Sequence, residues 1–301
     1  MKLTAIRTAG REEAAVRTAY GLVPVRLLNE AAGTEWGDTV QLLLDSEQLA
    51  RLNGWLQDKG AAVLSTLEAI PLERAEYAPL YRRPRKIWGI GANYRDKAAD
   101  MSVVPPEAEP ICFMKPDTSL IGLGDAIVLP PEDGRYTAEA ELGIVIGRTC
   151  KDVPEEKALD VVAGFAATLD MTAQHIHARN PRFLGRSKSF DTFFSIGPEL
   201  ITPEEIEDLA ALRVETALNG RAMHRASVAE MIYTIPFIIS YFSRIMTLLP
   251  GDIIMTGTPG SVEIASGVTA ECRISGFASL ANPVRQAGEL EEPTFESNGG
   301  G

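Results

Sequence analysis

Three acidic residues draw attention because of where they fall in two apolar runs. Glu139 and Glu141 open the run at 142–147, and Asp170 closes the run at 163–170. Side chains alternate across a β-strand, so Glu139 and Glu141 project from the same face. Two carboxylates at that spacing repel each other unless a proton or a cation lies between them. With Asp170 alongside, they make an all-oxygen group suited to Mg²⁺, Mn²⁺ or Ca²⁺. The alternative is a strand edge with solvated acids.

The composition limits the classes of partner. The chain has 301 residues, of which 45% are hydrophobic and 23% are charged, which is typical of a globular protein with a sizeable core. A net charge of −12 argues against nucleic acid and against anionic membranes as partners. It leaves an anionic small substrate open, because a divalent cation and a few local positive side chains reverse the field in a cleft.

Two apolar features bear on location. Residues 1–7 lack the apolar core of a signal peptide. The stretch 231–249 contains Pro236 and Arg244, so it predicts a buried helix rather than a membrane span. These observations predict a cytoplasmic protein.

The distribution of candidate strands, Gly/Pro turns and charged residues predicts two domains and a C-terminal tail. Residues 1–80 are expected to form a small N-terminal α/β domain, with a strand at 21–28 among its elements. A strand at 86–91 starts the main domain, residues 81–285, which alternates short strands with Gly/Pro turns and is predicted to be a β-rich α+β domain. Residues 286–301 are acidic and then glycine-rich, and they are predicted to be disordered.

Two local signals within the main domain are specific. Asn219-Gly220 favours a tight turn, which predicts a hairpin between the strands on either side. A helix is expected to start at Ser227 and to be kinked by Pro236.

Eight motifs occur in an order that is familiar as a set. They are Gly-Ala-Asn-Tyr-Arg-Asp (91–96), Phe-Met-Lys-Pro-Asp-Thr-Ser-Leu (113–120), Ala-Glu-Ala-Glu-Leu (138–142), Leu-Asp-Met-Thr-Ala (169–173), Lys-Ser-Phe-Asp-Thr-Phe (188–193), Gly-Pro (197–198), Leu-Pro-Gly-Asp (249–252) and Thr-Gly-Thr-Pro-Gly (256–260). Each motif is weak alone, but the ordered set, over about residues 85–285, resembles the fumarylacetoacetate hydrolase family.

The resemblance implies a mixed β-roll or sandwich catalytic domain that forms a homodimer. It implies Mg²⁺, or Mn²⁺ or Ca²⁺, held by Glu139, Glu141 and Asp170. It also implies small anionic 2-oxo or 1,3-dicarbonyl acids as substrates, and reactions that include C–C hydrolysis, decarboxylation, tautomerisation and isomerisation. A divalent cation chelated by a 2-oxo acid acts as a Lewis acid and stabilises an enolate, which serves all of these reactions.

Further site residues follow from the resemblance. Lys188 matches the lysine beside the metal and is assigned to the enolate or carboxylate of the substrate. Gly257 and Thr258 match a carboxylate-binding loop, whose N–H and hydroxyl groups suit an anion. Asn93 is a candidate polar contact, and Tyr136 either lines the site or packs in the core. Lys115 either acts like Lys188 or pairs with Asp117 on the surface.

The chain departs from the family pattern at the position of the catalytic base. Hydrolytic members carry a histidine–glutamate pair that activates water, and Lys97 and Asp100 stand at those positions here. A lysine at its unperturbed pKa of about 10.4 is charged at neutral pH and cannot accept a proton. If the segment is helical, the two residues lie one turn apart, so a plain ion pair is the alternative.

A second departure follows Asp170. Gln174 replaces a substrate-binding arginine and His177 replaces a glutamine. His177 is a candidate proton shuttle, or else a neutral hydrogen-bonding substitute for the glutamine. Gln174 remains a candidate substrate contact, and the loss of the arginine argues against a distal carboxylate on the substrate.

The sequence therefore predicts a divalent-metal-dependent enzyme that acts on a small 2-oxo or 1,3-dicarbonyl acid. The candidate catalytic residues are Lys188, His177, Lys97 and Asp100. Because the histidine–glutamate pair is absent, isomerisation, tautomerisation or decarboxylation is favoured over hydrolysis. A C–C hydrolase with a different base and a non-catalytic protein that binds a metal or ligand are the alternatives.

Overall fold

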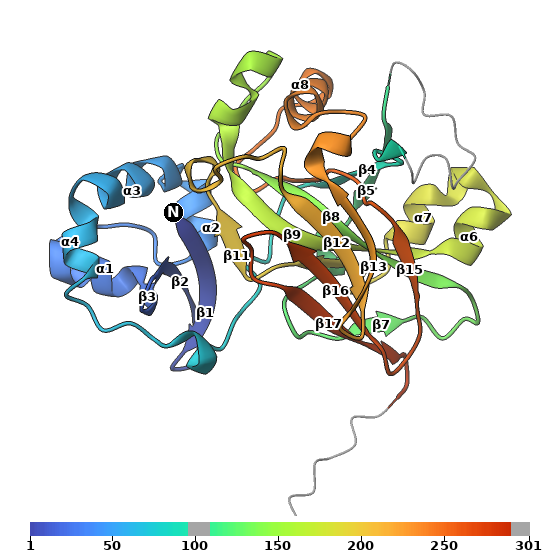
Figure 1. The fold of residues 1–301 in the computed structure, drawn as a ribbon, viewed down its shortest axis with the longest axis horizontal. Coiled ribbons are helices and arrows are strands. Elements are labelled where there is room, and N and C mark those ends of the chain that lie inside the picture. The colour runs from blue at the N-terminus through green and yellow to red at the C-terminus, as the bar shows by residue number, and fades with distance from the viewer. Residues whose placement is uncertain (96–108, 290–301) are drawn as a thin grey trace, which may run out of the picture.

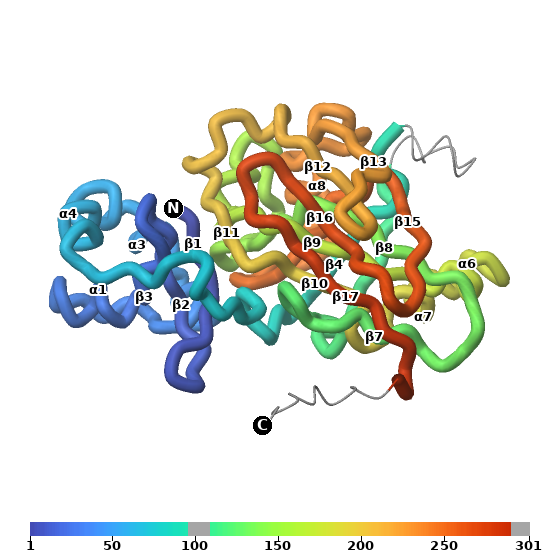
Figure 2. Tube along the Cα trace, turned by 60° about the horizontal axis from the view of Figure 1, so that its bottom comes forward, coloured from blue at the N-terminus to red at the C-terminus, as the bar shows by residue number. Residues whose placement is uncertain are grey.

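Two β-sheets form the body of the protein (Figures 1 and 2). The computed structural model describes residues 1–95 and 109–289. Within these ranges, one sheet has twelve strands and the other has five. The β-rich α+β class predicted from the sequence is confirmed.

The described elements follow one another along the chain in the order given by their residue numbers. The strands are β1 Lys2–Thr8, β2 Arg11–Thr18, β3 Gly21–Pro24, β4 Ile87–Gly91, β5 Ile111–Lys115, β6 Leu120–Ile121, β7 Ile127–Leu129, β8 Tyr136–Ile146, β9 Val162–Ala173, β10 Phe194–Ile196, β11 Glu199–Ile201, β12 Arg213–Leu218, β13 Arg221–Ser227, β14 Ile253–Met255, β15 Ser261–Ile264, β16 Thr269–Ile274 and β17 Leu280–Gln286. The α-helices are α1 Val25–Ala32, α2 Val40–Asp45, α3 Leu49–Trp55, α4 Ala61–Leu64, α6 Gln174–Arg179, α7 Leu184–Lys188 and α8 Ile235–Ile245. The short 3-10 turns are η2 Leu72–Arg74, η3 Asp117–Ser119, η4 Glu155–Val161, η5 Pro181–Phe183, η6 Pro203–Glu205 and η7 Val228–Glu230, and η1 Leu56–Gly60 is a π-helix.

The N-terminal strands extend the larger sheet. β1 pairs with β11, Leu3 opposite Leu200, and the sheet runs β3-β2-β1-β11-β9-β8-β14-β4-β5. Helices α1 to α4 lie around these strands at the left of Figure 1. Buried side chains of this unit, such as Leu44 and Leu52, belong to the same core cluster as Phe194. A domain boundary at residue 80 stays a prediction, since both the sheet and this core continue across it.

The β8–β9 pair lies at the centre of the molecule and positions the candidate site. The two strands pair antiparallel along nearly their whole length. Every residue of β8 is buried, because both faces of the strand are covered. Ala140, Leu142 and Ile144 face a core that also contains residues of the five-stranded sheet β13-β12-β16-β17-β7, which lies over β8 and β9 (Figure 2). Glu139 and Glu141 alternate with them and project from the opposite face.

Two segments differ from the sequence prediction. The predicted strand 21–28 is divided, since β3 ends at Pro24 and α1 begins at Val25. Proline has no N–H to give to a strand ladder, which explains where the strand ends. Pro236 does not kink a helix but lies in the first turn of α8, where Thr234 caps the helix. Proline is tolerated there because the first N–H groups of a helix have no partner within it.

Other predictions have mixed outcomes. The Asn219-Gly220 hairpin is confirmed: it joins β12 to β13, with φ of 50° and 79° at the two turn residues. Gln286, the first residue of the predicted tail, is the last residue of β17, and 290–301 lie outside the described residues. Among the helices described, none is both long and apolar enough to cross a membrane.

Candidate active site

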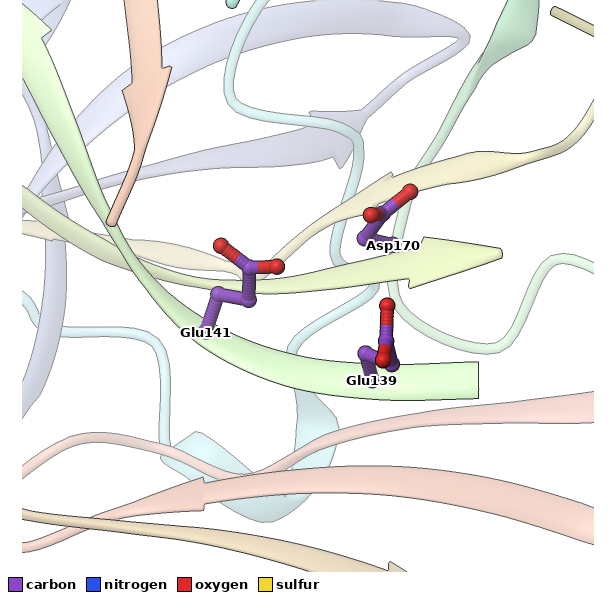
Figure 3. A group of neighbouring side chains, drawn as sticks. All are labelled: Glu139, Glu141 and Asp170. Carbon is purple, nitrogen blue, oxygen red and sulfur yellow. The ribbon is translucent and has the colours of Figure 1, made fainter. Parts of the chain in front are cut away.

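Three carboxylates meet on one side of the β8–β9 pair. The register places Asp170 directly opposite Glu139. Figure 3 shows Glu139, Glu141 and Asp170 rising from the same side of the two strands. All three are buried, and one oxygen of each lies within 4.8 Å of the others. This carboxylate trio presents the oxygen donors that suit a hard divalent cation.

The protonation of Glu141 reflects the crowding of negative charge. Burial raises the pKa of Glu141 well above its usual range, and the charges of Asp170 and Glu139 raise it further. Lys188 and the Gly257 N–H act in the opposite direction but do not cancel the effect. A cation placed among the three carboxylates relieves the same repulsion.

Lys188 provides one positive charge next to the trio. It is the last residue of α7 and is 5% exposed. Its Nζ donates to Asp170 and lies 3.3 Å from Glu139 Oε2. Burial disfavours its charge, but Asp170 and Glu139 outweigh burial, so the pKa of Lys188 is raised. The Nζ also lies 4.3 Å from the centre of the Phe113 ring, within the range of a cation–π interaction.

Lys115 provides a second positive charge. Its Nζ donates to three backbone carbonyl oxygens, those of Met171 at 2.9 Å, Lys188 at 2.8 Å and Phe193 at 2.7 Å. It also lies 2.7 Å from Asp170 Oδ1. One ammonium group therefore joins β9, the end of α7 and the segment before β10 around the carboxylate of Asp170.

The structure decides between the two interpretations of Lys115. A surface pair with Asp117 is wrong, because Lys115 is only 2% exposed and faces Asp170 instead. Burial lowers the pKa of Lys115 to about 8, with Asp170 opposing and Lys188 reinforcing the shift. The one sequence signal for this position is alternation along β5, which places Lys115 on the same face as buried Phe113.

Gly257 orients one of the carboxylates. Its N–H donates to Glu141 Oε2. Its φ is +95°, and an added Cβ would lie 2.7 Å from the Cβ of Asn93. Only glycine satisfies both the backbone conformation and this close approach.

We predict that Gly257→Ala destabilises the protein more than Gly267→Ala. Gly267 also has a positive φ, +87°, but an added Cβ there meets nothing within 4 Å. Gly267→Ala, the control, should therefore lose only about 1–2 kcal/mol of stability, the cost of a left-handed backbone conformation. Gly257→Ala should lose about 1–3 kcal/mol more, because the added Cβ overpacks against Asn93. Urea unfolding measures both. Equal losses in the two variants would show that the contact with Asn93 relaxes freely.

Asn93 and Thr258 are engaged with the backbone. The side-chain amide of Asn93 donates to the carbonyl oxygens of Tyr233 and Thr256, and its Oδ1 accepts the N–H of Tyr233. Asn93 thus ties together the loops that hold Gly257. The Thr258 hydroxyl donates to Gly260 O and accepts from Gly260 N. As substrate contacts, both remain predictions.

The remaining described candidates lie on β8 and on α6. Tyr136 is buried on the opposite face of β8 and packs edge-on against Phe193 and His175, which matches the core interpretation. Gln174 is the first residue of α6, which follows β9 directly. His177, one turn further on, is half-buried, and burial together with Lys188 lowers its pKa while Glu139 opposes the shift. The charges of Lys188 and Glu139 both act on His177, and its part in the site stays a prediction.

Lys97 and Asp100 lie outside the described residues, so their part in the site stays a prediction.

A buried cluster of acids and lysines, held by the central strands of a β-rich fold, is the kind of site found in enzymes that handle small polar substrates. A family model described as "Fumarylacetoacetate (FAA) hydrolase C-terminal" matches residues 86–285. The chain belongs to the fumarylacetoacetate hydrolase family.

The relatives with names of known activity are enzymes. The 2,4-didehydro-3-deoxy-L-rhamnonate hydrolase of Sphingomonas sp. (strain SKA58) is 39% identical over 208 residues, covering 68% of this chain and 70% of that protein. The maleylpyruvate hydrolase of Sphingobium sp. SYK-6, solved with manganese(II) and pyruvate, matches with a TM-score of 0.76 and 30% identity over 95% of this chain and 99% of that one. The 2-hydroxyhepta-2,4-diene-1,7-dioate isomerase of Mycobacterium marinum matches with a TM-score of 0.71 and 28% identity over 96% of this chain and 100% of that one. The family thus includes both hydrolases and isomerases.

Proposed function

We propose that this protein is a divalent-metal-dependent enzyme that acts on a small anionic 2-oxo or 1,3-dicarbonyl acid. The observation that carries the proposal is the carboxylate trio, buried and gathered within 4.8 Å. Mg²⁺ is the proposed cation, with Mn²⁺ and Ca²⁺ as alternatives. The manganese(II) and pyruvate in the Sphingobium relative support both parts of the proposal.

The residues present fit a dication. Three acidic side chains and the two lysines leave the cluster with one net negative charge when all are ionised. A dication among the oxygens reverses that sign, and the cluster then attracts an anionic substrate. The raised pKa of Glu141 points the same way, because crowded carboxylates favour a cation or a proton between them. When bound, a divalent cation acts as a Lewis acid that stabilises negative charge on a carbonyl oxygen.

The side chains of the chain have distinct roles in this proposal. Lys188 lies beside Glu139 and Asp170, where its ammonium group stabilises the negative charge of the substrate. Lys115 has no hydrogen left for the substrate, since its contacts are with three carbonyls and Asp170, and it positions the other groups instead. His177 has a lowered pKa, so its imidazole is neutral at neutral pH and able to accept a proton.

Isomerisation, tautomerisation or decarboxylation is the proposed type of reaction, because each needs a proton to move but none needs an activated water. A C–C hydrolase is the second candidate. The hydrolase names of two relatives, at 39% and 30% identity, favour it. Solvent ¹⁸O separates the two, since only hydrolysis places the label in the product.

The test is turnover of oxaloacetate and of acylpyruvates with Mg²⁺ and with EDTA, in the wild-type protein and in His177→Gln. We expect metal-dependent turnover, and a loss of at least about a hundredfold in kcat for His177→Gln if the imidazole carries the proton. Unchanged kcat in His177→Gln would assign His177 a hydrogen-bonding role. Tight binding of these acids without any turnover would support a ligand-binding protein instead of an enzyme.

A further inference from the structure

Two threonines stand next to the carboxylate trio on β8 and β9. Thr137 and Thr172 are register partners, adjacent to the pair formed by Glu139 and Asp170. Residues two apart on a strand share a face, so both threonines project on the side of the carboxylates. Thr137 is 1% exposed and Thr172 is 2% exposed. Among the described residues, neither hydroxyl has a hydrogen-bond partner.

Other buried threonines near the trio do have hydrogen-bond partners for their hydroxyl groups. Thr168, on the same face of β9, donates to the carbonyl oxygen of Glu141. Thr256 donates to the carbonyl oxygen of Leu142. A buried hydroxyl without a partner bears its full desolvation penalty, so such a group indicates a missing ligand or water. Two of them side by side form a small polar subsite.

The charged side chains near the two threonines indicate whether the bound group is charged or neutral. Arg135, two residues before Thr137, is paired with Glu263 at 3.1 Å, and Glu263 is the β15 partner of Thr137. Lys115 and Lys188 are both paired with Asp170. A carboxylate placed at the threonines would therefore meet acids and cations that already have partners. A neutral hydroxyl, in contrast, both donates to and accepts from the threonine hydroxyls.

We propose that Thr137 and Thr172 bind a hydroxyl group of the substrate. The substrate is then a 2-oxo acid with a neutral, hydroxylated chain, and not a diacid. The inference rests on the proposed function, since it assumes that the carboxylate trio holds the 2-oxo acid end. Two residues of strand place the hydroxyl pair about 7 Å from the trio, which matches a hydroxyl toward the far end of a six-carbon acid.

Three six-carbon probes test this inference: 2-dehydro-3-deoxygluconate, 2-oxohexanoate and 2-oxoadipate. Each is titrated into the Mn²⁺-loaded full chain by calorimetry. We expect the hydroxylated acid to bind most tightly and 2-oxoadipate most weakly. Thr137→Val and Thr172→Val keep the β-branched shape and lose the hydroxyl, and each should weaken binding of the hydroxylated acid about tenfold while leaving 2-oxohexanoate within about twofold.

Matched variants separate recognition from folding. Thr137→Ser and Thr172→Ser keep the hydroxyl and should keep the preference for the hydroxylated acid. Thr269→Val, on β16 in the other sheet, should change neither binding nor preference. Thermal melting confirms that each variant is folded.

The outcomes discriminate clearly. The inference is overturned if 2-oxoadipate binds most tightly of the three probes. It is also overturned if the valine variants weaken the binding of all three probes equally or leave the preference unchanged, because the two threonines then hold only a structural water. Binding of 2-oxohexanoate without selectivity overturns this inference alone. Failure of every probe to bind the loaded protein overturns the proposed function as well.

Discussion

Replacing Glu141 with glutamine should weaken Mn²⁺ binding and at the same time stabilise the metal-free protein. The side chain is 1% exposed, and its carboxylate lies with those of Asp170 and Glu139. Changes to groups that only support metal ligands weaken metal binding 10- to 100-fold, so loss of a ligand charge should weaken it by about a hundredfold or more. The amide keeps an oxygen for the Gly257 N–H and removes one of three crowded charges.

The effect on stability has a definite pH dependence. Burial first, and then Asp170 and Glu139, raise the pKa of Glu141 above its usual value of 4.5. The folded state therefore holds this proton more tightly than the unfolded state, and stability falls as pH rises through the raised pKa. In EDTA, the melting temperature of the wild type should fall relative to that of Glu141→Gln as pH rises above the usual glutamate pKa of 4.5 and through the raised pKa of the folded state.

Calorimetry with Mn²⁺ and melting in EDTA measure the two effects. Glu215→Gln is the control, since Glu215 is also buried but pairs with Arg225 and Arg273 on the five-stranded sheet. It should leave Mn²⁺ affinity unchanged. Wild-type Mn²⁺ affinity in Glu141→Gln would falsify the assignment of Glu141 as a ligand.

The grouping of the trio was predictable because its causes are local. Alternation fixes Glu139 and Glu141 on one face, and the two apolar runs fix the strands that carry them. Asp170 joins them because β9 pairs with β8 in the register that opposes it to Glu139. The Asn219-Gly220 turn was predictable for the same reason, since the turn type depends on the two residues in it.

Other features depend on partners that are distant in sequence. β1 joins the larger sheet through β11, about two hundred residues away, and a short strand carries no signal for such a partner. The side chain of Asn93 can donate and accept hydrogen bonds as a ligand contact would, yet in the fold its amide donates to the carbonyl oxygens of Tyr233 and Thr256. The sequence shows that such a side chain can form hydrogen bonds, but the tertiary fold decides with which groups.

Lys115 is the clearest case of this kind. Its sequence neighbour Asp117 offers a plain surface pair, but alternation along β5 turns Lys115 inward. There it meets three carbonyl oxygens, from Met171, Lys188 and Phe193, which no local pattern reveals. Carbonyl oxygens only accept hydrogen bonds, so the three N–H groups of a buried ammonium fit between them.

Lys115→Met should accordingly destabilise the protein by about 3–5 kcal/mol, because it removes one of the two cations beside buried Asp170 and takes a donor from three buried carbonyl oxygens. Urea unfolding of the metal-free protein measures this. Turnover should fall as well, because the carbonyl oxygen of Lys188 loses its bond to Lys115, and this bond anchors the backbone that carries the Lys188 ammonium. Lys86→Met is the control, since it removes the partner of buried Asp252 away from the trio. Both variants are expected to lose stability, but only Lys115→Met is expected to lose turnover, and that result would show that Lys115 positions the site. If both variants retain turnover, the role of Lys115 is limited to stability.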